Sequence, residues 1–288
     1  MITPGNNFFD MFTFDVVGSL SPNTPSEEND PTNDYVNYLD ASDAQAANLA
    51  GVVDGVVTIR SDSSNIASGR GRESVRVTSR NQYTHGLVNL DLAHMPGKKI
   101  HQSFSSHATG EIDIIEGVNH QATNATTLHT SANCTMMSAD CSGVEAGGPP
   151  SFGDGLNANG GCVDAMQWTS EQINVWFFPP GAVSADALSD GPDPAGWGSP
   201  TAQWVGGDGC DMDEHFGENV VVFDTTFCGE RAAGVWPHMT QCALPAPSSQ
   251  DYIRNHPEAY ADTYWSIDPL KVYTDAAAVA GKRASAVH

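Results

Sequence analysis

Short runs of alternating apolar and polar residues recur along this chain, and Gly, Pro or Asn residues separate most of them. Alternation with a period of two puts every second side chain on one face, as in a β-strand with one buried face. Several short runs of this kind, separated by turn residues, predict an antiparallel β-sandwich. Apart from an acidic strand treated below, the predicted strands are residues 56–60, 74–79, 86–93, 164–168, 173–178, 219–227 and 265–273.

Helical patterns are scarce in the sequence. Long amphipathic runs are absent, and the best helix candidate is 249–260, which follows Ser248 and is interrupted at Pro257. Residues 18–34 and 142–161 are rich in turn-forming residues and are predicted to be loops. Because all-β sandwiches often form one domain at a length of 288 residues, we expect a single all-β domain with long loops.

The most distinctive stretch reads Gly-Glu-Ile-Asp-Ile-Ile-Glu-Gly and runs from Gly110 to Gly117. In a regular strand Glu111 and Asp113 would share one face and the first two isoleucines the other. Glu116 would then fall on the isoleucine face, where an unpaired carboxylate is costly. One extra residue, a β-bulge near 114–115, returns Glu116 to the face of the other two acids. We therefore expect a row of three acids backed by apolar packing.

Such a row of acids is suited to acid–base chemistry. Neighbouring carboxylates repel one another, so the pKa of at least one should rise while the others stay low. Glycoside hydrolysis needs this combination of one ionised carboxylate and one protonated carboxylic acid. An exposed acidic strand face or a cation site would have the same spacing, so the spacing alone leaves these alternatives open.

Motifs along the chain resemble those of glycoside hydrolase family 16. The acidic stretch is similar to the family signature in the bulged form typical of laminarinases, and its flanks resemble the fungal secreted branch. The matching segments follow the family order and are 30–32, 36–38, 74–77, 94–96, 117–119, 127–130, 132–134, 226–229, 259–260 and 264–265. The resemblance implies a concanavalin A-like jelly roll over residues 1–273, with a C-terminal tail at 274–288.

The resemblance also implies a role for each acid. Glu111 matches the family's nucleophile, which must be ionised to attack the anomeric carbon. Glu116 matches the acid/base, which protonates the leaving oxygen and later deprotonates water. Asp113 lies between them, and its expected role is electrostatic: it would hydrogen-bond the nucleophile and keep the two glutamates' pKa values apart.

Two further residues are candidates for substrate binding. His129 ends a predicted strand at 126–129; in the family this position adjoins the acid/base, and a satisfied core histidine is the alternative. Trp168 precedes Thr169 as in the family's cleft motif, so we expect it to offer its indole face to a sugar; a large core residue is the alternative. Trp176 is expected to be a core residue instead.

The segment 97–109 departs from the family pattern. The family carries a Trp-Pro-x-x-Trp strand here and another Trp just before the acids, whereas this chain has a shorter segment without Trp. Arg231 also replaces a family Trp. At least two sugar-stacking platforms are therefore lost, and we expect weaker binding of the polymer and impaired turnover.

Charge limits the classes of partner. Lys plus Arg is 12 and Asp plus Glu is 35, which gives a net charge of −23. Such a charge argues against binding nucleic acid or an anionic membrane surface. It suits a neutral polymer such as a β-glucan. We expect a monomer that needs no cofactor; a structural calcium ion fits the family, but no Asp-rich loop identifies its site.

Cysteines and glycosylation sequons favour secretion. The six cysteines form no Cys-x-x-Cys pair, so some disulfides in an oxidising compartment are a better interpretation than a zinc ribbon. Asn124 and Asn133 begin Asn-x-Thr sequons and are predicted glycosylation sites. The N-terminus shows no signal peptide, so a targeting segment is expected to have been removed or to lie outside this chain.

The function predicted from the sequence is that of a retaining endo-β-1,3(4)-glucanase acting on laminarin-like or mixed-linkage glucans. Two alternatives remain open. One is a catalytically weak, lectin-like glucan-binding protein that has lost its tryptophan platforms. The other is a transglycosylase on the same scaffold.

Overall fold

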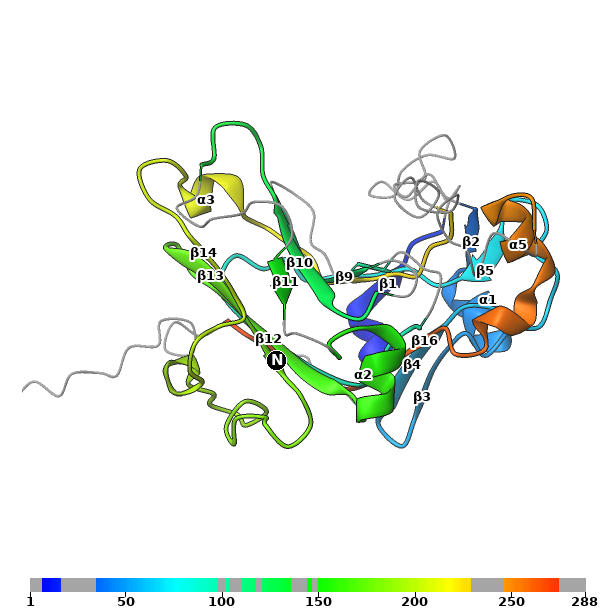
Figure 1. The fold of residues 1–288 in the computed structure, drawn as a ribbon, viewed down its shortest axis with the longest axis horizontal. Helices are drawn as coiled ribbons and strands as arrows, with labels where there is room; N and C mark the ends of the chain where they lie inside the picture. Colours follow the sequence, from blue (N-terminus) through cyan, green and yellow to red (C-terminus); the bar gives the residue numbers. More distant parts are fainter. Residues whose placement is uncertain are drawn as a thin grey trace, which may run out of the picture.

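The computed structural model describes residues 7–16, 35–97, 102–103, 110–117, 121–135, 144–146, 150–228 and 246–274 (Figure 1). Within these ranges, the chain forms two layers of mostly antiparallel strands. No described helix is long and apolar enough to cross a membrane.

The larger layer is a seven-stranded antiparallel sheet with the order β14-β13-β12-β7-β16-β4-β3. In Figure 1 it runs from β14 on the left to β3 at the lower right. In chain order its strands are β3 (Ala50–Val53), β4 (Val56–Arg60), β7 (Gly86–His94), β12 (Cys162–Trp168), β13 (Gln172–Phe178), β14 (Ala202–Val205) and β16 (Tyr264–Tyr273).

The second layer consists of two smaller antiparallel sheets. Four strands follow the order β11-β10-β9-β8 and three follow β1-β6-β15. A separate pair, β2 with β5, is parallel. The strands are β1 (Phe12–Phe14), β2 (Val36–Tyr38), β5 (Arg72–Ser74), β6 (Val77–Ser79), β8 (Gln102–Ser103), β9 (Glu111–Gly117), β10 (Asn124–His129), β11 (Val144–Ala146) and β15 (Val222–Phe223).

The main hydrophobic core fills the space between the two layers. Trp265 of β16 and Phe223 of β15 are fully buried there and make an edge-to-face contact. Phe8 and Phe12, near the N-terminus, are stacked in the same core. A smaller apolar cluster that includes Trp176 and Trp197 lies on the other face of the large sheet. Trp176 is thus a core residue, as predicted.

Short helices and 3₁₀ turns connect the strands. They are α1 (Ala41–Ala46), α2 (Gly153–Asn159), α3 (Met212–His215) and α5 (Ser249–Asn255), with 3₁₀ turns η1 (Phe8–Met11), η2 (Pro194–Gly196) and η4 (Pro257–Tyr260). The side chain of Ser248 caps α5 by accepting a hydrogen bond from the Asp251 backbone N–H. The helix ends just before Pro257, so the predicted helix and its interruption are confirmed.

The predicted strands agree with the structure except in two places. The predicted strand 74–79 is two strands, β5 and β6, because the chain leaves one sheet and enters another. The predicted strand 219–227 contains only the two-residue β15. The predicted loop 142–161 is wrong in part, since β11 and α2 lie in it. The predicted loop 18–34 and residues 275–288 of the predicted tail lie outside the described residues.

Candidate active site

Strand β9 carries the three acids, and close packing explains the glycine at each of its ends. A Cβ on Gly110 would lie 2.4 Å from the backbone oxygen of His215, beside α3. A Cβ on Gly117 would lie 2.3 Å from the ring of Phe152, at the start of α2. Glycine therefore lets both helices pack directly against the ends of the acidic strand.

The register between β9 and β10 contains the predicted bulge. Asp113 pairs with Thr127, but the next pair is Glu116 with Ala125. Three steps along β9 thus correspond to two steps along β10, so Ile114 and Ile115 together oppose one residue of β10. The irregularity predicted from the position of Glu116 is confirmed.

The bulge brings the three acids to one face of β9. Directly opposite residues of antiparallel strands share a face, and Glu111, Asp113 and Glu116 all pair with odd-numbered residues of β10. Glu111 is half-buried, whereas Asp113 is 3 % and Glu116 8 % exposed. The isoleucines between them belong to the main core, so the predicted row of acids on apolar packing is present.

His129 lies beside the first two acids. Its Nε2 is 3.2 Å from Oδ2 of Asp113, and it pairs with Glu111 across the strands. The hydrogen bond to Asp113 raises the pKa of His129, and burial opposes that rise. The side chain is 58 % exposed, so the alternative of a buried core histidine is wrong. This hydrogen bond goes to Asp113 rather than to Glu116, the expected acid/base.

Thr127 is the residue whose hydroxyl reaches Glu116. Its Oγ1 donates a hydrogen bond of 3.1 Å to Oε2 of Glu116, and both side chains are buried. Thr127 was not among the site residues predicted from the sequence. The signal was present, because Thr127 lies two residues before His129 on the same face of a predicted strand.

Asn124 is buried beneath the acids instead of carrying a glycan. It is 1 % exposed, its amide nitrogen donates to the backbone oxygen of Ile114 at 2.7 Å, and its amide oxygen accepts from the backbone N–H of Glu116 at 3.0 Å. A glycan on that nitrogen would displace these bonds, so the predicted glycosylation of Asn124 is wrong. Asn133 is exposed, and a glycan there stays a prediction.

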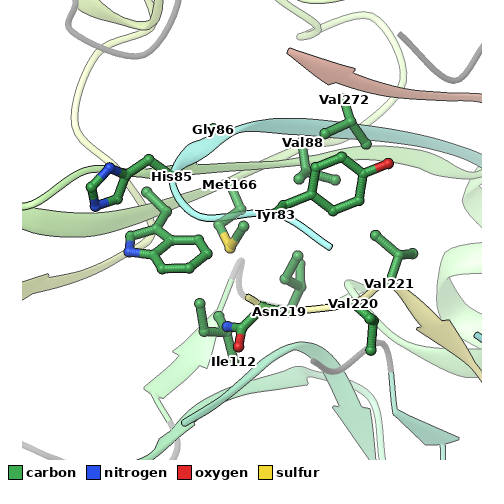
Figure 2. A pocket seen from close by; sticks show the side chains of 12 residues that line it. Tyr83, His85, Gly86, Val88, Ile112, Met166, Asn219, Val220, Val221 and Val272 are labelled. Atoms are coloured by element: carbon green, nitrogen blue, oxygen red, sulfur yellow. The ribbon is translucent and has the colours of Figure 1, made fainter. Parts of the chain in front are cut away.

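Trp168 does not offer its face to a cleft. It is 2 % exposed and lies on the same face of β12 as Met166, toward the other layer. Both line an apolar cavity between the layers, which Figure 2 shows with Val88 and Ile112. The predicted role of Trp168 as a sugar platform is therefore wrong: alternation along the strand directs its indole into the core, on the opposite side of β9 from the acids.

Among the described residues, two groups of side chains have metal-ligand chemistry. Donor atoms of Glu111, Asp113 and His129 lie within 4.8 Å of one another, so a cation site remains compatible with this face. The other group contains Cys134 and Cys210, which form a disulfide, so their sulfurs are not free to bind a metal. This bridge confirms the prediction of at least one disulfide. A structural calcium ion is still only what the family resemblance allows.

The altered segment 97–109 contributes one described strand next to the acids. Gln102 pairs with Gly117 and Ser103 with Glu116, so β8 borders the Glu116 end of β9. Residues 98–101 and 104–109 lie outside the described residues, and so does Arg231.

Known proteins resemble the chain over most of its length. The profile described as "XgeA-like, catalytic GH16 domain" matches residues 25–273. An endo-1,3(4)-beta-glucanase of Arthroderma benhamiae is 36% identical over 298 residues, which cover 93% of this chain and 63% of the relative. The chain thus spans less than two thirds of that relative's length.

Solved structures give the same result. Laminarinase 16A of Phanerochaete chrysosporium, solved with β-glucans in donor and acceptor sites, has a TM-score of 0.80 and 34% identity and covers 93% of this chain and 96% of its own. An elongating family 16 β-1,3-glucosyltransferase has a TM-score of 0.83 and 35% identity, with coverage of 94% and 97%. These likenesses confirm the predicted jelly-roll sandwich. With its acidic strand, its fold and a profile match over residues 25–273, the chain belongs to glycoside hydrolase family 16.

Proposed function

We propose that the chain is a retaining endo-β-1,3(4)-glucanase that hydrolyses laminarin-like or mixed-linkage β-glucans by double displacement. The observation that carries the proposal is the bulged β9, which presents Glu111, Asp113 and Glu116 on one face. The name of the Arthroderma benhamiae relative and the β-glucans bound to laminarinase 16A support the substrate class.

Each acid then has a defined step. Glu111, the more exposed glutamate, attacks the anomeric carbon as a carboxylate and forms the glycosyl–enzyme bond. Glu116 donates its proton to the departing glycosidic oxygen, and then removes a proton from the water that releases the sugar. Asp113 lies between them, with its Oδ2 3.2 Å from Nε2 of His129, and acts electrostatically on both glutamates.

The exposure of each side chain decides whether it can contact the substrate. His129 is exposed beside Glu111 and is a donor or acceptor for a sugar hydroxyl. Because Trp168 is buried, it adds no platform. The loss of tryptophans from 97–109 leaves fewer stacking faces, so we expect turnover below that of a family member that keeps them.

Secretion and a monomeric state are part of the proposal. The disulfide between Cys134 and Cys210 supports an oxidising compartment, since such bridges persist outside the cytosol. The net charge of −23 favours separate, soluble molecules.

A transglycosylase is the second candidate. The similarity to an elongating β-1,3-glucosyltransferase favours it, because the glycosyl enzyme can react with a sugar hydroxyl instead of water. Separation of the products from laminari-oligosaccharides distinguishes the two outcomes. Chains longer than the starting sugar indicate transfer, and only shorter chains indicate hydrolysis.

The test of the proposal is reducing-sugar release from laminarin by the wild type and by Glu111→Gln and Glu116→Gln. Each substitution keeps the volume and removes one role, so activity should fall at least about a hundredfold while the circular dichroism spectrum is unchanged. Glu171→Gln, at an exposed position, is the matched control and should stay active. Azide should restore turnover to a Glu111→Ala enzyme and give a glycosyl azide of inverted configuration.

Near-normal turnover of Glu111→Gln would refute the nucleophile assignment. A wild type that releases no sugar but is retarded on a laminarin affinity gel would establish the lectin-like alternative.

A further inference from the structure

The position of Glu116 depends on the bulge in β9. At five residues from Glu111, its side chain would face the core in a regular strand. It shares a face with Asp113 because Ile114 and Ile115 together oppose one residue of β10. Any group that fixes the bulge therefore also fixes the direction of the acid/base carboxyl.

One side chain spans the bulge from the neighbouring strand. The amide oxygen of Asn124 accepts from the Glu116 backbone N–H at 3.0 Å, and its amide nitrogen donates to the Ile114 backbone oxygen at 2.7 Å. A bulge leaves backbone groups out of the regular ladder, and buried groups of this kind need other partners. A single planar amide supplies one at each end of this bulge.

The surroundings hold Asn124 itself in place. Its backbone N–H donates to the hydroxyl of Ser151 at 2.9 Å, just before α2. Thr126 donates a second hydrogen bond of 3.1 Å to the Ile114 oxygen. Asn124 and Thr126 are both almost fully buried, so water does not compete for these bonds.

We propose that Asn124 is a positioning residue for Glu116: it holds the bulge in the form that directs the acid/base toward the leaving group. The inference rests on the proposed function. Asn124 acts through the backbone of Glu116 and touches no substrate. Its removal should therefore impair the steps that need proton transfer by Glu116 more than binding or nucleophilic attack.

The experiment compares Asn124→Ala with the wild type on two substrates. The sugar leaving group of laminarin must be protonated as it departs, whereas the dinitrophenolate of a 2,4-dinitrophenyl β-laminaribioside leaves without an acid. We expect kcat on laminarin to fall about tenfold to a hundredfold with KM changed less than about threefold. On the aryl glycoside, kcat/KM should stay within about threefold of the wild type, because it reports only the first step.

Asn157→Ala is the matched control. Asn157 also uses both amide atoms on one short stretch of backbone, the N–H and the carbonyl of Met95, each at 2.9 Å. Its loss should lower the melting temperature, as for Asn124→Ala, and leave kcat unchanged on both substrates. If Asn124→Ala fails to fold, Asn124→Asp keeps the shape and the acceptor for Glu116 but loses the donor to the Ile114 oxygen at the other end of the bulge, so it should show the same dependence on the leaving group.

Two results overturn the inference alone. One is near-normal kcat of the Asn124 variant on laminarin; the other is an equal loss on both substrates, which is a general structural effect. In either case the proposed function still holds if the wild type is active and the Glu116→Ala variant loses far more activity on laminarin than on the aryl glycoside. A wild type inactive on both substrates overturns the proposed function and the inference together.

Discussion

At the scale of single residues, the neighbouring strand β10 supplies hydrogen-bond partners for two of the acids. Thr127 and His129 lie two apart on β10, and each bonds a different carboxyl, that of Glu116 and that of Asp113. The exposed His129 ring carries a raised pKa, so its charged pairing with Asp113 is present below that pKa and is lost as the pH rises through it.

The hydroxyl of Thr127 should matter for catalysis. Thr127→Val keeps the shape but removes the hydrogen bond that orients the Glu116 carboxyl. A hydrogen bond of this kind contributes about 1 kcal/mol, so we expect kcat/KM on laminarin to fall about fivefold to tenfold. Thr127→Ser keeps the hydroxyl and should retain most of the activity. Equal losses in both variants would show that packing, and not the hydroxyl, is what the site needs.

Predictions for single residues succeeded where the two-residue alternation of a strand determines which face a side chain lies on. The three acids and the bulge follow from the position of Glu116 relative to two isoleucines. Asn124 and Trp168 were misjudged because a sequon or a motif match carries no information about burial. The predicted roles of the acids themselves await the kinetic tests.

At the scale of elements, a disulfide connects the end of the β9–β10 strand pair to a neighbouring segment. Cys134 follows β10 and is joined to Cys210, just before α3, across 76 residues of sequence. The residue after α3 packs on Gly110, which precedes the acids. The bridge thus connects segments that border both β9 and β10.

Removal of this bridge should destabilise the fold. The double variant Cys134→Ser/Cys210→Ser should lose about 2–5 kcal/mol of unfolding free energy in urea titrations, because the unfolded chain is no longer constrained. A disulfide-linked peptide containing both cysteines should appear in a digest of the unreduced wild type. Recovery of both residues as free, alkylated thiols from that digest would contradict the bridge and weaken the argument for secretion.

Elements that satisfy a simple pattern were predictable, and the others depend on packing. Strand β4 alternates cleanly in burial, and β4, β7 and β16 all lie within one residue of their predicted positions. Helix α2 lies in a Gly-rich segment with poor helix propensity. It is held by the buried Leu156, by the bonds of Asn157 to Met95 and by the left-handed Gly160 at its C-terminus. None of these tertiary contacts is visible in the local sequence.

At the scale of the whole molecule, the net charge is −23, and one of the acids, Asp164, is buried in the large sheet. Asp164 of β12 is 2 % exposed and has the thiol of Cys162 as a neighbour at 3.3 Å, while its Oδ1 has no hydrogen-bond partner in the described residues. Burial raises the pKa of Asp164 to about 7. Half-buried Asp91, on the adjacent strand β7, has its pKa raised to about 6 by burial and by Asp268. The strand pattern in the sequence does not predict that these acids are costly to ionise, because it does not show which loops bury them.

Asp164 should make stability depend on pH. Its pKa is higher in the folded chain than the ordinary 3.8, so its contribution is fully present below about pH 4 and is lost as the pH rises toward 7. That difference corresponds to roughly 4 kcal/mol at most, at about 1.4 kcal/mol per pKa unit.

The Asp164→Asn variant cannot ionise at this position. Its free energy of unfolding should match that of the wild type near pH 4 and exceed it near pH 7.5. Asp208→Asn removes an equal charge from an exposed turn and should follow the wild-type curve at every pH. Urea titrations between pH 4 and 8 measure all three proteins. Parallel curves for the wild type and Asp164→Asn would show that Asp164 ionises in the folded chain as readily as in the unfolded one.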